Sequence, residues 1–190
     1  MRNNDRKSDI IISAARLFKE KGYSAVTMRD LAKELNIKAA SLYNHIASKQ
    51  EILVLIVISL AEEFTEVMNE ILESNVSNVD KIDRVIHLHV EISHRNPDAL
   101  ACLNNDWMHL TEDQLAYFLT MREDYEKNFI KIVEEGVAKG EFKALQPKVT
   151  AFTILSTLRT MYLWIERTKD ISVNELTYNV KGLLLEGIRK

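Results

Sequence analysis

Residues 27–51 read TMRDLAKELNIKAASLYNHIASKQE, and this stretch predicts two short helices joined by a tight turn. The first helix has one apolar face, because its apolar residues recur at i, i+3, i+4 and i+7 (Met28, Leu31, Ala32 and Leu35). The second, from Lys38 to Ile46, turns Leu42 and Ile46 inward. This order of helix, turn and helix predicts a helix-turn-helix unit, whose second helix enters the major groove of DNA.

Particular residues predict where these helices begin and end. Thr27 with Asp30 three residues on predicts a capping box, with Asp in place of Glu or Gln. Asn36 suits the left-handed conformation that ends a helix. Ser48 and Glu51 form a second capping box, which starts the next helix at Lys49.

The outer face of the second helix carries residue types that suit DNA. Asn44 offers the paired donor and acceptor that match adenine, and Ala39 and Ala40 allow close approach to base edges and thymine methyls. Ser41, Tyr43 and His45 can reach phosphate oxygens, as can Lys49 at the head of the following helix. An ordinary solvated helix pair would also be polar outside, so spacing alone leaves both interpretations open.

The run from Thr27 to Leu53 resembles the DNA-binding signature of the TetR family of bacterial transcriptional repressors. The shared features are a Thr that opens the first helix, a Leu-Ala pair inside it, Leu-Tyr-x-His at 42–45, and Lys-x-x-Ile from Lys49. Asn36 and Ile46 depart from the Gly and Phe that the family usually has. The resemblance implies a DNA-contact set of Thr27, Met28, Arg29, Lys38, Ala39, Ala40, Ser41, Tyr43, Asn44, His45 and Lys49.

The composition predicts an all-α fold, because only 5 Gly and 2 Pro stand among 190 residues to interrupt long helices. Residues 1–50 carry ten Lys or Arg against five Asp or Glu, whereas residues 51–190 carry fifteen against twenty-three. A basic amino-terminal module on an acidic body is typical of a protein that presents one end to nucleic acid. We expect a DNA-binding domain over 1–48 and an effector-binding and dimerisation domain over 49–190.

The remaining chain predicts about nine helices in all. A loose basic arm is expected over 1–8, with helices over 8–21, 49–74, 79–95, 97–110, 111–139, 147–168 and 172–187 beside the two described above. The last two are apolar over more than one stripe, and the resemblance implies that they form a four-helix homodimer interface. Two core helices of a monomer are the alternative.

A few features of the sequence indicate where the protein is located and whether it can form a disulfide. Cys102 is the only cysteine, so no intrachain disulfide can form. The amino-terminal residues lack the apolar segment of a signal peptide, and the longest apolar run, 52–61, is too short to span a bilayer. We therefore expect a cytoplasmic protein with no membrane partner.

Catalytic and metal sites have little support. Glu91 and His94 have the Glu-x-x-His spacing of di-iron helical bundles, but such a site needs a second motif, which the chain lacks. His87, His89 and His94 could be metal ligands or pocket groups, although surface or packing roles explain each more simply. We expect no catalytic residue, no metal and no cofactor.

Arg159 lies within an apolar helix, and a buried Arg needs an anion, either a protein carboxylate or an acidic ligand. The body segments 94–110, 122–125, 136–142 and 158–164 resemble the branch of the family that senses acyl-CoA thioesters. The resulting candidate effector-binding residues are His89, Trp107, Tyr117, Met121, Tyr125, Arg159 and Trp164.

These observations predict a homodimeric repressor that binds a near-palindromic operator and is released by a small apolar acid, with an acyl-CoA thioester as the candidate effector. One alternative is a regulator of the same family that controls efflux or stress genes with a drug-like effector. A helical di-iron enzyme and a helical ligand carrier without a DNA role are the others.

Overall fold

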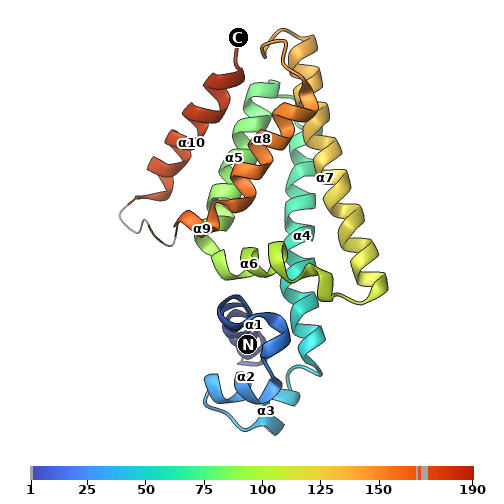
Figure 1. The fold of residues 1–190 in the computed structure, drawn as a ribbon, viewed down its shortest axis with the longest axis vertical. Coiled ribbons are helices and arrows are strands. Elements are labelled where there is room, and N and C mark those ends of the chain that lie inside the picture. Colours follow the sequence, from blue (N-terminus) through green and yellow to red (C-terminus); the bar gives the residue numbers. More distant parts are fainter. Residues whose placement is uncertain (1, 166, 168–170) are drawn as a thin grey trace. The chain divides into compact units, whose positions relative to one another are not determined.

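The computed structural model describes residues 2–165, 167 and 171–190, with side chains from Arg6 onward, and the fold is all-α (Figure 1). Its elements are α1 (Arg2–Lys21), η1 (Tyr23–Ala25), α2 (Met28–Glu34), α3 (Ala39–Tyr43), α4 (Lys49–Glu73), α5 (Asn78–Arg95), α6 (Pro97–Asn105), η2 (Trp107–His109), α7 (Glu112–Ala138), α8 (Pro147–Thr160), α9 (Tyr162–Ile165) and α10 (Val173–Ile188). If α8 and α9 are counted as one interrupted helix, this part of the chain has the nine α-helices that were expected.

The chain forms two compact units. The first consists of the residues up to Glu62 together with Asp98–Leu119, and the second consists of Glu63–Pro97 and Thr120–Lys190. Both α4 and α7 therefore contribute residues to each unit. The division into domains at residue 48 stays a prediction.

The first unit has its core where α1, α2, α3 and the start of α4 meet. Its fully buried side chains are Ile10, Ala14, Phe18, Leu31, Leu42, Ile46, Ile52 and Leu53. The glycines that follow α1 and α7 have a positive φ, 82° at Gly22 and 72° at Gly140. Such a backbone conformation is open to glycine at little cost.

The second unit is built along α5, which packs against α8, α9 and α10 (Figure 1). Its fully buried side chains include Met68, Ile82, Val85, Ile86, Phe129, Ile132 and Leu158. A carboxylate from the α7–α8 connection caps α5, since Glu141 accepts the backbone N–H groups of Asn78 at 2.7 Å and Val79 at 3.2 Å. These bonds add to a local cap, in which Ser77 Oγ accepts the N–H of Asp80 at 3.1 Å.

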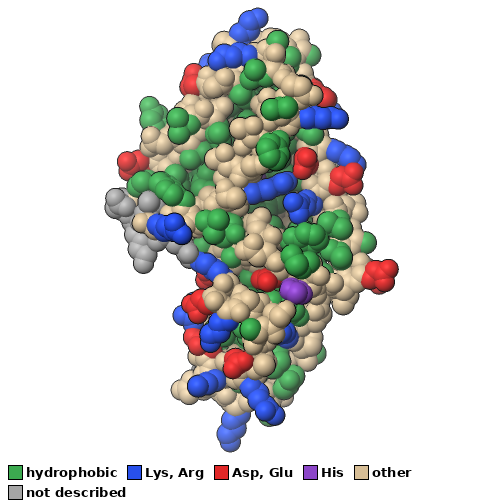
Figure 2. Space-filling model, in the orientation of Figure 1, with side chains coloured by type: hydrophobic (Ala, Val, Ile, Leu, Met, Phe, Trp, Pro, Cys, Tyr) green, Lys and Arg blue, Asp and Glu red, His purple; other side chains and the backbone are tan. Residues whose placement is uncertain are grey.

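Apolar side chains remain on the outside of α8 and α10. Val149 and Phe152 are 61% and 71% exposed, and Tyr178 and Leu183 are 78% and 79% exposed. Figure 2 shows hydrophobic side chains on the surface over the area where Figure 1 places these two helices. Large apolar side chains left in water on neighbouring helices are typical of an interaction surface.

Three sequence-based boundaries are wrong. The arm over 1–8 is helical from Arg2, because no Gly or Pro interrupts the segment and Lys7 Nζ lies 3.1 Å from Glu51 Oε1. The helix expected over 97–110 ends at Asn105, where Asn104 Nδ2 donates to the backbone carbonyl of Leu100 at 2.8 Å and competes with the helical bond.

The helix expected over 147–168 is interrupted at Met161, whose N–H donates to Leu158 in a tighter i−3 bond. It resumes as α9. Of its last three expected residues, Arg167 is in a turn, and 166 and 168 lie outside the described part of the chain.

Candidate nucleic-acid interface and interior cluster

Local bonds within α2 and the turn after it position α3. The Asp30 N–H donates to Thr27 Oγ1 at 3.2 Å, and the Thr27 N–H donates to Asp30 Oδ2 at 2.9 Å, so the predicted capping box is confirmed. The Thr27 hydroxyl also donates to Asp30 Oδ2 at 2.6 Å, and this bond, followed by the one from the Thr27 N–H, holds the pKa of the Asp30 carboxyl below its usual value. Asn36 follows with φ 52°, which is the left-handed conformation expected of it.

α3 presents its polar residues outward. Leu42 is fully buried, whereas Lys38, Ala40, Tyr43 and Asn44 are exposed, and Ala39, Ser41 and His45 are partly exposed. The prediction that this helix reaches Ile46 is wrong, because α3 ends at Tyr43 and the next two residues form a turn. Asn and His are weak helix formers, and the chain must reverse here so that Ser48 can cap α4.

The start of α2 contributes an adjoining polar surface. Thr27 and Arg29 are exposed and Met28 is partly exposed. Together with α3, these residues are the candidate DNA-contact set that the sequence predicts, and all of them lie within the first compact unit. Their contacts with DNA stay a prediction.

Lys49 has a structural role that the sequence did not show. Its ammonium group donates to the backbone carbonyls of Tyr23 and Val26, at 2.8 Å each, and lies 4.2 Å from the centroid of the Tyr23 ring. These contacts bind the start of α4 to η1. A contact from Lys49 to phosphate stays a prediction, and only one of its three N–H donors is left for it.

Ser48 and Glu51 cap α4 with one difference from the expected box. The Glu51 N–H donates to Ser48 Oγ at 3.0 Å, but Glu51 Oε2 accepts the N–H of Ala47 at 2.7 Å rather than that of Ser48. The bond from Ala47, followed by the ion pair with Lys7, lowers the pKa of the Glu51 carboxyl. The carboxylate therefore ties α1 to the start of α4.

A buried polar cluster lies in the second unit. His89 Nε2 and Tyr125 Oη are 3.0 Å apart, and Phe64 packs on His89 with a ring-centroid distance of 4.7 Å. Burial, and then the charge of Arg159, lowers the pKa of His89 to about 3, so its imidazole is neutral at pH 7. Burial also raises the pKa of Tyr125. Phe64 was missed by the sequence analysis, because its spacing in α4 marks it only as a core residue.

Arg159 is near this cluster and has a protein carboxylate as partner. Its Nη2 lies 3.7 Å from Glu126 Oε2, and its side chain is 27% exposed. Burial and the like charge of Arg122 lower the pKa of the Arg159 guanidinium, while Glu126 opposes that shift. Arg122 and Glu126 are one helical turn apart on α7, so two guanidinium groups lie near one carboxylate. Met121 is buried one turn before Tyr125.

The other candidate effector residues are placed differently. Trp107 and Tyr117 belong to the first unit, where Trp107 stacks on Phe118 and the Tyr117 hydroxyl donates to Glu62 at 3.2 Å. Trp164, on α9, is 45% exposed. The structure thus brings together His89, Tyr125 and Arg159 but does not group Trp107 and Tyr117 with them.

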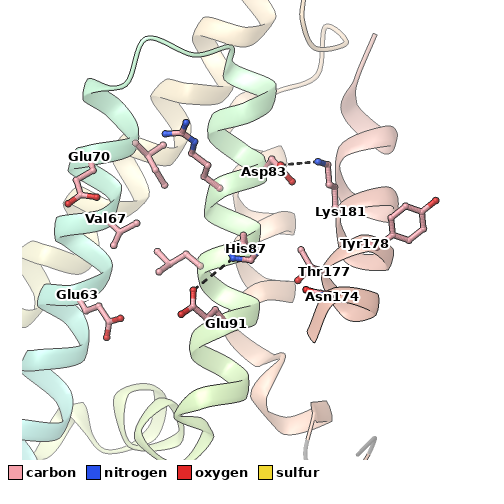
Figure 3. A pocket seen from close by; sticks show the side chains of 13 residues that line it. Glu63, Val67, Glu70, Asp83, His87, Glu91, Asn174, Thr177, Tyr178 and Lys181 are labelled. Carbon is pink, nitrogen blue, oxygen red and sulfur yellow. Dashed lines mark ion pairs between the residues drawn. The ribbon is translucent and has the colours of Figure 1, made fainter. Parts of the chain in front are cut away.

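A groove of about 690 Å³ lies between α4, α5 and α10 (Figure 3). None of the candidate effector residues lines it. The lining residues are Glu63, Val67, Glu70, Ile71, Asp83, Arg84, His87, Leu88, Glu91, Asn174, Thr177, Tyr178 and Lys181. No local sequence pattern predicts it, because its α10 wall is far from α4 and α5 in the chain.

The described residues offer neither a metal site nor a membrane-spanning helix. No group of three or more His, Cys, Asp or Glu side chains there is arranged to hold a metal ion. None of the helices described is long and apolar enough to cross a membrane.

A small helical unit that exposes the polar face of a short second helix, joined to a larger helical body, defines a regulator of the helix-turn-helix class. Comparison with known families makes this assignment specific. Residues 10–56 match the model of the bacterial regulatory proteins of the tetR family, and residues 75–188 match a tetracyclin repressor-like C-terminal domain. The chain belongs to the TetR family, whose members are DNA-binding regulators of transcription and not enzymes.

Individual relatives span nearly the whole chain. The HTH-type transcriptional repressor KstR2 of Rhodococcus jostii is 23% identical over 185 residues, which are 96% of this chain and 91% of that protein. The ketosteroid regulator KstR2 of Mycobacterium tuberculosis has a TM-score of 0.90 at 20% identity, covering 97% and 95% of the two chains. AibR, solved with isovaleryl coenzyme A and operator DNA, has a TM-score of 0.79 at 20% identity, covering 95% and 98%. These structural likenesses establish the fold.

Proposed function

We propose that this protein is a cytoplasmic transcriptional repressor that binds a near-palindromic operator as a homodimer and is released by a small apolar acid. The observation that carries the proposal is the exposed face of α3, held outward by buried Leu42 and by the capped, left-handed turn before it. Exposed Asn44 reads adenine, while Lys38, Ser41, Tyr43 and His45 contact phosphates. The residues at the start of α2, Thr27, Met28 and Arg29, extend this surface.

Homodimerisation through α8 and α10 brings in a second copy of α3, the recognition helix that enters the major groove. Val149, Phe152, Tyr178 and Leu183 leave a large apolar area in water, and burial against a second copy would remove it. Two recognition helices must then lie roughly 34 Å apart to enter successive major grooves. In this proposal the two predicted domains have separate roles. Residues 1–48 bind DNA, and residues 49–190 bind the effector and form the dimer.

The proposed effector is an acyl-CoA thioester or a similar apolar acid. The AibR structure is a complex with isovaleryl coenzyme A and operator DNA, and the KstR2 structure is described as that of a ketosteroid transcriptional regulator. In this chain, Arg159 and the nearby Arg122 supply positive charge beside an uncharged, buried pair, His89 and Tyr125. A ligand with an apolar acyl group and an anionic part matches that combination. A coupling of about 1–3 kcal/mol would weaken DNA binding about 5- to 150-fold, which is enough for a switch.

An electrophoretic mobility shift assay with the DNA upstream of the protein's own gene tests the proposal. We expect a retarded complex that isovaleryl coenzyme A dissociates and free coenzyme A does not. Arg159→Met should keep the complex but weaken its response to the thioester, and Lys127→Met, which removes an exposed ion pair on α7, is the matched control. A complex that no thioester affects, with a thermal shift only on adding drug-like compounds, would favour the alternative effector class.

A further inference from the structure

The groove between α4, α5 and α10 has the dimensions and surface of a small-molecule site. Its volume of about 690 Å³ is within the range of about 300–1,000 Å³ that such sites occupy. The apolar side chains of Val67, Ile71 and Leu88 line it, and Asn174 and Thr177 line it on the α10 side (Figure 3). All three walls belong to the second compact unit.

Charge distinguishes this groove from the surroundings of Arg159. Four carboxylates line it (Glu63, Glu70, Asp83 and Glu91) against two permanently basic groups, Arg84 and Lys181. Arg95, beside the groove, adds a third basic group, so one carboxylate remains in excess even when it is counted. A coenzyme A thioester, with its phosphates, would meet repulsion in such a site.

Three of the four carboxylates in the groove form ion pairs with protein cations, and these pairs are open to solvent. Lys181 Nζ lies 2.8 Å from Asp83 Oδ2, His87 Nε2 lies 4.0 Å from Glu91 Oε2, and Arg95 pairs with both Glu63 and Glu91. All of these side chains are about one-third exposed or more, and pairs that solvent reaches in this way are weak. An ammonium group of a ligand can therefore replace a protein cation at little cost.

We propose that this groove binds an organic cation with an apolar or aromatic body. The body would lie on Val67, Ile71 and Leu88, and the cationic group would lie toward Glu63 and Glu70 on α4. This site is separate from the proposed thioester site, because it shares no residue with the cluster of His89, Tyr125 and Arg159. A ligand held between α4 and α10 would also restrain the helix that carries Tyr178 and Leu183.

The test is a fluorescence titration of the full chain with auramine O, a cationic aromatic dye, in the absence of DNA. We expect saturable binding that weakens as the salt concentration rises, because the carboxylates attract the dye through a screened interaction. The anionic dye anilinonaphthalene sulfonate, at the same concentrations, should not displace it. Binding of both dyes alike would show a merely apolar surface and overturn the proposal, as would no binding of auramine O.

Variants locate the site. The double variant Glu63→Gln/Glu70→Gln should weaken auramine O binding by about tenfold or more, equivalent to about 1.4 kcal/mol. Glu66→Gln, an exposed position on α4 outside the groove, is the matched control and should bind like the unaltered protein. Arg159→Met should also leave dye binding unchanged, so that failure of the thioester proposal does not affect this one. Equal losses in the Glu66 and groove variants would contradict the assignment.

Discussion

Asn44 and Tyr43 are adjacent residues for which we expect different effects on DNA binding. Both side chains are exposed, at the end of α3 and just after it. Asn44→Ala should remove a base contact and cost about 1–3 kcal/mol on the cognate operator, with a change of base preference. Tyr43→Ala should weaken all sequences similarly, because a phosphate contact carries no sequence information. Binding to cognate and scrambled operators, measured for both variants, separates the two roles. An equal loss on both DNAs for Asn44→Ala would remove its base-reading role.

Lys49 shows why a residue's role cannot be taken from its place in a motif. Its position at the head of α4 predicts a phosphate contact, yet its ammonium group bonds to the Tyr23 and Val26 carbonyls. Tyr23 in turn donates from its hydroxyl to Gln50 at 2.8 Å and stacks on His109. The lysine therefore fixes η1 against the start of α4. Only the three-dimensional structure could reveal this, because the carbonyls come from residues more than twenty positions away.

At the scale of elements, the start of α2 and the start of α4 each depend on an ionised carboxylate. The pKa of Asp30 and that of Glu51 are both lower in the folded protein than their usual values. Their stabilising contribution is thus present above the unfolded pKa values, near 4, and is lost as the pH falls through the lower, folded ones. We expect the first unit to lose stability in that acidic range.

Thermal melts followed by circular dichroism from pH 7 down to pH 3 check this expectation. In Glu51→Gln the decline below about pH 5 should be shallower than in the unaltered protein, because one of the two titrating caps is gone. Glu66→Gln, whose carboxylate caps no helix, should follow the unaltered curve. A Glu51→Gln curve that also follows it would mean that the carboxylate contributes nothing to folding.

Much of the helical arrangement was predictable because its signals are local. The predicted starts of α2, α4 and α10 and the predicted ends of α1 and α7 are within about a residue of the observed ones. Capping residues and glycines mark these positions locally. The errors arose where neighbouring structure competes with local preference, at the break at Met161 and at the early end of α6. The outward orientation of the polar residues of α3 was likewise predictable from the helix period. The grouping of His89, Tyr125 and Phe64, and the whole of the groove, required helices distant in sequence to be placed side by side.

At the scale of the whole molecule, the proposed switch needs two properties that a single copy does not supply. A near-palindromic operator needs two recognition helices at a fixed separation, and a release mechanism needs that separation to change. The exposed apolar residues of α8 and α10 belong to the same compact unit as His89, Tyr125 and Arg159. An effector bound in that unit could therefore bias the dimer directly, and the dimer surface becomes the decisive feature to test.

Phe152→Glu should convert the protein from dimer to monomer. The side chain is 71% exposed in the isolated chain, so the substitution leaves the core of the second unit intact, but it would place a charge within the proposed dimer interface. Light scattering after size exclusion should give the chain mass of 21.9 kDa for the variant and twice that value for the unaltered protein. Operator affinity should fall by about 100-fold or more, because the two half-sites are no longer bound by one molecule. Ile12→Glu, at an apolar position on α1 that is 63% exposed, is the matched control for mass. If the Phe152 variant stays dimeric, or the unaltered protein is itself monomeric, α8 is not part of a dimer interface and the paired arrangement of recognition helices loses its basis.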